Sequence, residues 1–168
     1  LADWKTLDDL QVPKRSKFVL SWVYHPRALP LAVPSAAAHM AAMRGMDVTI
    51  LRPEGYALPP AIMERARAAA AASGGSISET NEPAEALEGA QVIYAKEWGC
   101  TTHYGDETAD ATLRRRHKNW CVDNSWFAKT ADDCRLMHCL PVRRNVAVAD
   151  RSEEHTSELQ SRQYLVCR

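Results

Sequence analysis

The segment 135–145, "RLMHCLPVRRN", contains the residues best suited to chemistry in this sequence. It begins as a short apolar strand that carries His138 and Cys139, and the strand ends at a proline. Arg143 and Arg144 follow, and their planar guanidinium groups can donate paired hydrogen bonds to a phosphate, a carboxylate or a polarised carbonyl oxygen. A thiol beside two arginines at a strand end therefore indicates a site for an anionic or polarised ligand.

The end of this strand also offers backbone groups. The carbonyl groups of Cys139 and Leu140 have no guaranteed partner in the sheet there, so they can accept hydrogen bonds from a ligand amine. Pro141 stops the strand and supplies no N–H. The alternative is an inert buried thiol, with the two arginines solvated or paired with acids. The sequence names no base or oxyanion site that would make Cys139 a covalent nucleophile.

Two further segments place polar residues directly after apolar runs. Lys96 ends "AQVIYAK" (90–96) and could pair with a substrate carboxylate, with Trp98 as a wall of the site. Alternatively, its aliphatic stem is buried at a strand end and its ammonium group reaches solvent. His25 lies in the loop "YHPRALPLAVP" (24–34), whose three prolines limit the freedom of the backbone. Such a loop suits the positioning of a substrate, but it also suits any tight connection.

The elements that would position these residues alternate along the chain. Short runs rich in Val, Ile, Leu and Trp predict strands buried on both faces, and segments with proline starts or glycine stops predict helices between them. The predicted strands are 17–22, 46–51, 75–78 (a weaker candidate), 90–96, 119–123 and 135–140, and the predicted helices are 34–45, 59–75 and 82–89. This alternation predicts an α/β fold, a doubly wound, Rossmann-like parallel sheet with helices on both faces. Ligands of such sheets bind beyond the carboxyl ends of the strands, where the loops that follow 17–22, 90–96 and 135–140 would converge.

Composition and missing motifs argue against several other classes of protein. Among the 168 residues, 21 are basic and 21 acidic, so the total charge gives no reason to expect a nucleic acid or an anionic membrane as partner. The apolar runs are far shorter than the ~20 residues of a transmembrane helix. The five cysteines form no CxxC pair, which favours reduced thiols in the cytoplasm, and the scattered Cys/His pairs lack the second pair that a zinc site needs. No Gly-rich fingerprint or P-loop follows any strand, and the run "RRRH" (114–117) is most simply a solvated helix face.

The two ends of the sequence are unusual. The first residues, "LADWKTLDDL", lack an initiator methionine and resemble the middle of a helix, so we expect the chain to begin inside a longer protein. From Arg151 onwards, "RSEEHTSELQSRQYLVCR" resembles the translation of a sequencing adapter, although a polar amphipathic tail is the alternative. We therefore expect residues 1–150 to form one domain, incomplete at both ends, and 151–168 to be a non-native, disordered tail.

At "HCLPVRRN" (138–145) the chain resembles the ornithine carbamoyltransferases, and the pattern "HCLPxRRN" resembles their N-acylornithine branch, which uses N-acetylornithine or N-succinylornithine. "WVYHPRALPLAV" (22–33) and "VIYAKEWG" (92–99) are similar to two further motifs of the second, ornithine-binding domain. The resemblance implies that the side-chain amine of an N-acylornithine attacks carbamoyl phosphate in arginine biosynthesis, giving an N-acylcitrulline and phosphate. It implies no covalent enzyme intermediate, no cofactor and no metal. The parent protein would be a cytoplasmic homotrimer whose partners are these two small substrates.

The same resemblance implies roles for individual residues. Cys139 and Leu140 would lie at the carbamoyl group and the attacking amine, and Arg143 would bind the carbamoyl oxygen. Cys139 and Arg143 are thus the expected catalytic residues, acting by orientation and electrostatic stabilisation. His25, Lys96 and Leu140 would bind the substrate, the first two by holding the acylornithine through its carboxylate.

The chain also departs from the family pattern. The first domain, with its Ser-x-Arg-Thr phosphate-binding segment, is absent, so this chain would hold only half of the site. Some acetylornithine enzymes carry a lysine after the RRN motif where this chain has Ala147, which leaves the acyl group open. An ordinary ornithine carbamoyltransferase is disfavoured because "EWGCTTHYGD" (97–106) replaces the serine-methionine-glycine loop of that branch. A non-catalytic Rossmann-like binding module is the alternative from another class, and the missing dinucleotide fingerprint argues against it.

The N-acylornithine branch carries a deep knot, in which the connection after one strand passes through a proline-rich loop. The two elements resemble the connection after 90–96 and the loop 25–34 of this chain. We therefore expect the knot here, and we expect it to bring His25, Lys96 and Trp98 to one place.

Overall fold

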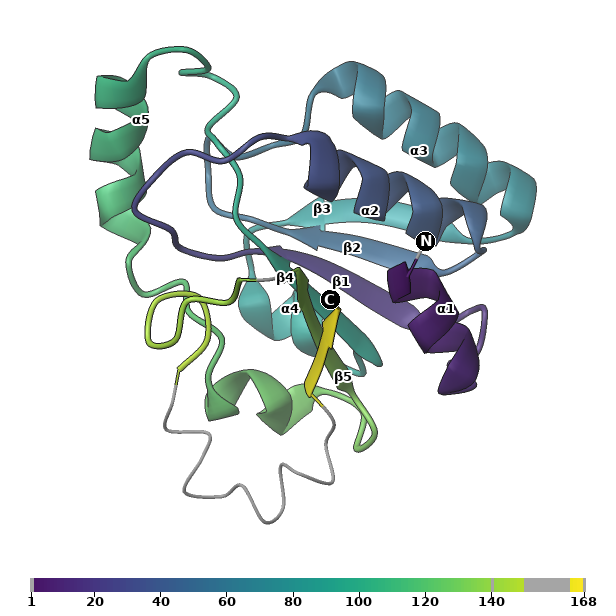
Figure 1. Ribbon diagram of the computed structural model, residues 1–168. Helices are drawn as coiled ribbons and strands as arrows, with labels where there is room; N and C mark the ends of the chain where they lie inside the picture. The colour runs from purple at the N-terminus through teal and green to yellow at the C-terminus, as the bar shows by residue number, and fades with distance from the viewer. Residues whose placement is uncertain (1, 140, 150–163, 168) are drawn as a thin grey trace.

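The computed structural model of the protein describes residues 2–139, 141–149 and 164–167. Six parallel strands form one sheet in the order β3-β2-β1-β4-β5-β6, with helices on both faces (Figure 1). The strands are β1 (Lys17–Trp22), β2 (Asp47–Leu51), β3 (Ser76–Thr80), β4 (Val92–Lys96), β5 (Arg135–Cys139) and β6 (Tyr164–Cys167). The helices are α1 (Ala2–Asp9), α2 (Ala32–Met43), α3 (Pro60–Ser73), α4 (Pro83–Leu87) and α5 (Glu107–Arg114), with the 3-10 turns η1 (Arg115–His117) and η2 (Asn124–Lys129). The predicted α/β class and the parallel, Rossmann-like sheet are confirmed.

The strand order reverses between β1 and β4. From β1 the chain adds β2 and β3 on one side, and then returns to add β4, β5 and β6 on the other. The register pairs Trp22 with Lys96, so β1 and β4 end at the same level. A crevice at such a reversal point is where ligands of open α/β sheets bind.

Alternating residues of the strands fill two separate cores. On one face, Phe18, Leu20 and Trp22 pack with residues of α1 and α2. On the other face, Val19 and Val23 pack with residues of α4 and η2. Both faces of the central strands are covered, which is why their sequences are apolar without alternation.

The second long helix, α3, begins and ends where its sequence predicts. Pro59 and Pro60 open it, because proline fits the first turn of a helix, where no N–H donor is needed. Gly74 ends it in the left-handed conformation (φ 78°) and donates its N–H to the carbonyl of Ala70. At Gly75 an added Cβ would lie 2.5 Å from the carbonyl oxygen of Met46, so the close approach of the chain to β2 requires glycine there.

The predicted strand at 119–123 is wrong. Val122 makes only an isolated bridge with Val148, and its N–H donates to the carbonyl of Ala147 at 2.9 Å. The place beside β4 in the sheet is occupied by β5, so this segment covers the edge of the core instead. Val122 is buried and Trp120 is partly buried, and this burial is the property that the sequence pattern detected.

The structure also differs from expectation at the end of the chain. Residues 164–167, part of the expected disordered tail, form β6 and pair in parallel with β5. Residues 151–163 lie outside the part of the chain that is described. The non-native origin of 151–168 stays a prediction. Along the described residues, no helix combines the length and apolar character that a membrane crossing demands.

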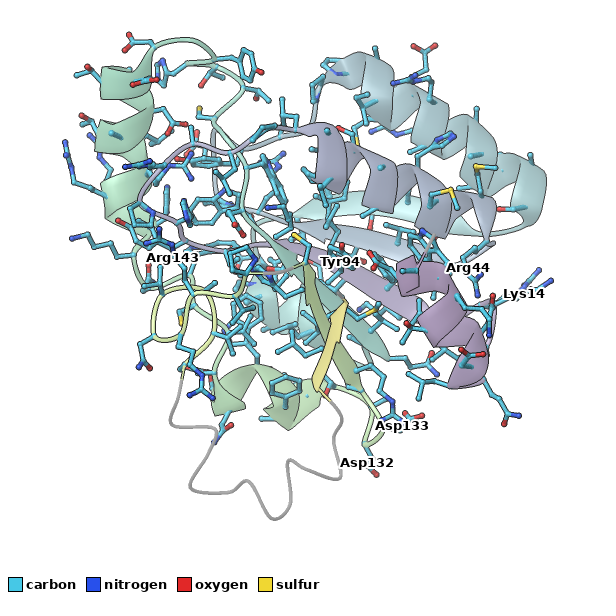
Figure 2. The ribbon with its side chains drawn as sticks, in the orientation of Figure 1. Lys14, Arg44, Tyr94, Asp132, Asp133 and Arg143 are labelled. Carbon is cyan, nitrogen blue, oxygen red and sulfur yellow. The ribbon has the colours of Figure 1, made fainter. Side chains whose placement is uncertain are left out.

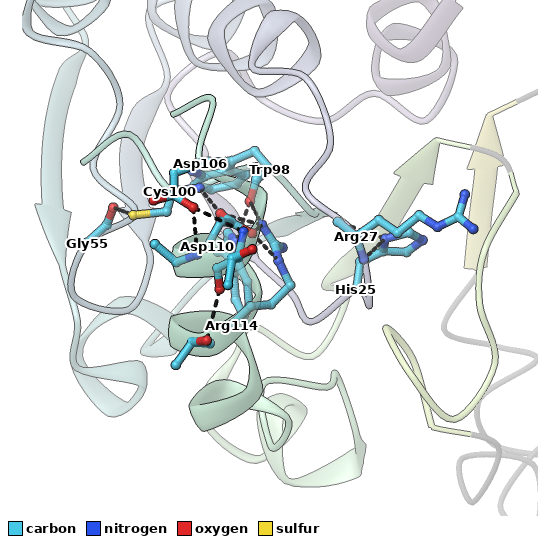
Figure 3. A network of polar contacts seen from close by, with 12 residues as sticks. His25, Arg27, Gly55, Trp98, Cys100, Asp106, Asp110 and Arg114 are labelled. Atoms are coloured by element: carbon cyan, nitrogen blue, oxygen red, sulfur yellow. Dashed lines mark hydrogen bonds and ion pairs between the residues drawn. The ribbon is translucent and has the colours of Figure 1, made fainter. Parts of the chain in front are cut away.

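The solvated face expected for "RRRH" is wrong for Arg114. This side chain is 1% exposed and binds Asp110 with two donors, Nε to Oδ2 at 2.9 Å and Nη2 to Oδ1 at 3.0 Å (Figure 3). Its guanidinium also lies 5.7 Å from the ring centre of Trp22 and 5.5 Å from that of Tyr56. Asp110 precedes Arg114 by one helical turn, which is the spacing that brings two side chains together on a helix.

We predict that Asp110→Asn lowers the free energy of unfolding by about 3–5 kcal/mol, because it leaves a buried guanidinium without its counter-charge. The matched control is Asp9→Asn, which breaks the pair with Lys5 at a surface where both side chains are more than half exposed. The control is expected to change stability by about 0.5 kcal/mol or less. Urea unfolding measures both, and equal effects would contradict the prediction.

Candidate functional site

The carboxyl ends of β1, β4 and β5 form the floor of the candidate site. Trp22 and Lys96 are partners in the ladder between β1 and β4, and Ala95 is paired with His138 between β4 and β5. The next register position therefore sets Lys96 beside Cys139. Side chains alternate along a strand, so Lys96 and Cys139 leave the sheet on the same face, as their neighbours Tyr94 and Met137 do.

Three charged or titratable side chains form a buried cluster at this edge. Lys96 is 5% exposed, Glu97 6% and His138 3%. The ammonium of Lys96 lies 3.3 Å from Glu97 Oε1, and His138 Nε2 lies 3.3 Å from Glu97 Oε2. The second pair is within ion-pair distance but lacks hydrogen-bond alignment. The alternative in which the ammonium of Lys96 reaches solvent is therefore wrong.

Glu97 remains a carboxylate despite its burial. Burial alone would raise the pKa of its carboxyl group, but contact with His138 and the positive charge of Lys96 outweigh it and lower the pKa to about 2. The cluster therefore carries a fixed negative charge between a lysine and a histidine at neutral pH.

Cys139 is half-buried at the end of β5. Burial raises the pKa of its thiol, while the charges of Lys96 and Glu97 act in opposite directions. A protonated thiol is a poor nucleophile, which agrees with a role that involves no covalent bond. The carbonyl oxygen of Cys139 contacts Nδ1 of His138. Leu140, the next expected site residue, lies outside the described residues.

His25 follows β1 and is held by its own loop. Its ring is 8% exposed, and Nδ1 lies 3.1 Å from the N–H of Arg27 and 2.9 Å from the carbonyl oxygen of Arg27 (Figure 3). Whichever of these two contacts operates, Nδ1 is used within the loop. This orientation leaves Nε2 to meet a ligand.

Arg143 lies in a tight turn after β5. Its carbonyl accepts the N–H of Ala147 at 2.9 Å, and Asn145 adopts the left-handed conformation (φ 56°) that asparagine tolerates. Figure 2 shows Arg143 on the side of the molecule where β1 and β4 end. Its side chain is exposed, and the structure gives no contact between it and Lys96, Glu97 or His138. The expected closeness of Arg143 to the other site residues thus stays a prediction.

The connection after β4 is fastened by tryptophans. Trp98 is fully buried, and its indole N–H donates to the carbonyl of Tyr56 at 2.9 Å. The backbone carbonyl of Trp98 in turn accepts the indole N–H of Trp22 at 3.0 Å. Trp98 therefore anchors the segment within the core, in place of the wall of the site that its position after Lys96 suggested.

The same connection touches the proline-rich loop. The N–H of Gly99 donates to the carbonyl of Leu29 at 2.9 Å, and Figure 1 shows the chain after β4 crossing the loop that precedes α2. This contact is compatible with the expected knot but does not establish it, because a chain can also run beside a loop without passing through it. The knot stays a prediction.

Comparison with known proteins agrees with this geometry. The family model described as "Aspartate/ornithine carbamoyltransferase, Asp/Orn binding domain" matches residues 32–166. The chain belongs to the aspartate/ornithine carbamoyltransferase family. The match reaches into the segment 151–168, whose origin it does not decide.

Two curated relatives carry the names of the N-acylornithine branch. The N-acetylornithine carbamoyltransferase of Xanthomonas campestris pv. campestris is 38% identical over 135 residues, which are 80% of this chain and 40% of the relative. The N-succinylornithine carbamoyltransferase of Bacteroides fragilis is 36% identical over 149 residues, which are 89% of this chain and 42% of the relative. The chain thus spans about two fifths of the length of these relatives.

A solved structure extends the likeness to three dimensions. Acetylornithine transcarbamylase in complex with acetylcitrulline superimposes with a TM-score of 0.83 at 34% identity. The superposition covers 94% of this chain and 49% of that one. At this identity the likeness supports the branch as well as the fold.

For this carbamoyltransferase domain, sequence reasoning missed the contact between Glu97 and His138. Both residues stand in the quoted motifs, but 41 positions separate them in the sequence. The sequence did contain an indication of this contact. The loops after the predicted strands 90–96 and 135–140 were expected to converge, which places the two strands close together in the sheet. Two titratable residues at the ends of adjacent parallel strands are expected to come close.

We predict that Glu97 makes the stability of the domain depend on pH in acid. The pKa of its carboxyl group is lowered in the folded state, so its stabilising effect is complete above the ordinary value of 4.5 and is lost as the pH falls from there to about 2. Glu97→Gln is expected to lower stability at pH 7 and to flatten the loss between pH 5 and pH 2. Urea unfolding at a series of pH values tests this. Glu64→Gln, at an exposed position of α3, is the control and should keep the slope of the unaltered protein.

Proposed function

We propose that this chain is the acylornithine-binding half of an N-acylornithine carbamoyltransferase. The complete enzyme would transfer the carbamoyl group of carbamoyl phosphate to the side-chain amine of an N-acylornithine, giving an N-acylcitrulline and phosphate in arginine biosynthesis. The observation that carries this proposal is the register of β4 and β5, which pairs Ala95 with His138 and so sets Lys96 and Cys139 at the next position, beside the sheet reversal between β1 and β4. The chain's relatives bear these enzyme names.

The geometry supports a reaction by orientation. Lys96 binds the substrate carboxylate, and Nε2 of His25 is available as a second contact. The backbone carbonyl of Cys139 would accept a hydrogen bond from the amine, and the family resemblance gives Leu140 the same role. The amine nitrogen attacks the carbamoyl carbon, the bond from that carbon to the phosphate oxygen breaks, and the amine loses a proton. Arg143 would polarise the carbamoyl oxygen, where negative charge develops.

The cluster of Lys96, Glu97 and His138 at the end of β4 and β5 fits an acceptor substrate that carries both a carboxylate and an amine. Lys96 supplies a cation for the first, while acceptor groups at the end of β5 suit the second. Relatives that use an acetyl and a succinyl group match this chain about equally, so the proposal names the N-acylornithine class. A homotrimeric, cytoplasmic parent stays a prediction.

We predict that the 168-residue chain by itself has no measurable carbamoyltransferase activity. Its sequence contains no Ser-x-Arg-Thr segment for the phosphate of carbamoyl phosphate, so only one of the two substrates has its site here. Colorimetric detection of acylcitrulline after incubation with both substrates measures this. Turnover near the rate of a full-length relative would contradict the half-site assignment.

We also predict different roles for the two neighbouring arginines. In the enzyme completed with its carbamoyl-phosphate domain, Arg143→Ala should lower kcat about a hundredfold, because one charge-assisted contact in the transition state is worth about 3 kcal/mol. Arg144→Ala is the matched control, since Arg144 is also exposed but makes a backbone bridge with Val148. Steady-state kinetics with acetylornithine and succinylornithine decides, and equal losses from the two variants would refute the assignment.

A further inference from the structure

A continuous set of contacts joins the two ends of the proposed acylornithine site. The carbonyl oxygen of Cys139, expected near the amine, contacts Nδ1 of His138. The other ring nitrogen, Nε2, lies 3.3 Å from one oxygen of Glu97, and the second oxygen of Glu97 lies 3.3 Å from the ammonium of Lys96. Glu97 therefore stands between the group that would receive the amine and the cation that would receive the carboxylate.

Burial makes Lys96 depend on Glu97. The side chain of Lys96 is 6% exposed, and a buried ion without a partner is strongly destabilised. Among the described residues, Glu97 is the acid found within ion-pair distance of this lysine. Without it, the ammonium group of Lys96 would be left without its neighbouring counter-charge, and its position at the site would no longer be held.

The cluster is nevertheless not saturated. An ammonium group has three donors, and the separation of 3.3 Å from Glu97 is longer than the ~2.8 Å of a tight charge-assisted bond. Glu97 Oε2 and His138 Nε2 are buried and have no aligned hydrogen-bond partner. Lys96 can therefore keep its contact with Glu97 and still donate to a ligand carboxylate.

We propose that Glu97 is a positioning residue for the acylornithine, which holds the ammonium group of Lys96 directed at the substrate carboxylate and links it through His138 to the end of β5. This inference rests on the proposed function. It differs from a purely structural role, in which Glu97 would affect every ligand equally through the stability of the fold. It also differs from a role in which Glu97 competes with the substrate carboxylate for Lys96. In that case, removing the Glu97 carboxylate would strengthen substrate binding.

The test compares two ligands on the full 168-residue chain. N-acetyl-L-ornithine carries the carboxylate, and N-acetyl-1,4-diaminobutane is the same molecule without it. Chemical-shift changes in NMR titrations give the two dissociation constants for the unaltered chain, for Glu97→Gln and for the control Glu64→Gln, which lies at an exposed position of α3.

The expected result is selective. Glu97→Gln should raise the dissociation constant of N-acetyl-L-ornithine about tenfold or more, the effect of one charge-assisted contact, and should change that of N-acetyl-1,4-diaminobutane less than twofold. Equal weakening for both ligands, no change, or tighter binding of N-acetyl-L-ornithine would overturn the inference while leaving the proposed function intact. If the unaltered chain binds neither ligand, the proposed function falls, and this inference falls with it.

A double-variant comparison covers the case in which Glu97→Gln alone does not fold. Lys96→Met with Glu97→Gln removes both charges together, so neither is left buried and unpaired. If Glu97 acts through Lys96, the double variant should bind N-acetyl-L-ornithine as Lys96→Met does, within about twofold. A further tenfold loss in the double variant would mean that Glu97 acts by another route and would overturn the inference.

Discussion

The parallel pairing of β1 with β4 is the constraint on which the rest of the molecule depends. Because Trp22 and Lys96 share a register position, the two strands end together and their following loops start side by side. Every other feature of the site extends from this edge: β5 pairs with β4 and adds His138 and Cys139. A slip of one residue in the β4–β5 ladder would turn Lys96 and Cys139 to opposite faces. The apolar runs of these strands, buried on both sides, hold that register.

Within the described residues, the cationic side chains of Arg114 and Lys96 are both buried, and their surroundings differ. Arg114 is held by a two-donor pair with Asp110 and is flanked by two aromatic rings, and of its guanidinium nitrogens only Nη1 has no hydrogen-bond partner. Lys96 has one loose contact with Glu97 and retains donors for another group. A planar guanidinium with fixed donors suits a permanent structural pair, whereas an ammonium group adapts to a ligand. The contrast agrees with a structural role for Arg114 and a binding role for Lys96.

The sequence predicted the elements whose signals are local. The apolar runs of β1, β2, β4 and β5 and the proline and glycine limits of α3 indicated their positions within one or two residues. The segment 119–123 was mistaken for a strand because an apolar run reports burial and not hydrogen-bond pairing. Arg114 was mistaken for a surface residue because its neighbours are basic, and the acid one turn earlier was overlooked. The contact between Glu97 and His138 depends on which strands are adjacent, which no local pattern contains.

The loop after β1 and the connection after β4 act as one unit. Gly99 donates to the carbonyl of Leu29, and a Cβ at Gly99 would lie 3.4 Å from Ala28, so the two backbones approach closely. His25 precedes this contact on one side, and Lys96 precedes it on the other. Trp98 anchors this connection to the core through its hydrogen bonds with the backbone of Tyr56 and the indole of Trp22. Neither proposed carboxylate contact can therefore move far without the other, since both are fastened to the same short stretch of paired backbone. A site that works by orientation gains from this arrangement, because the distance between its binding groups is set by the fold before the substrate arrives.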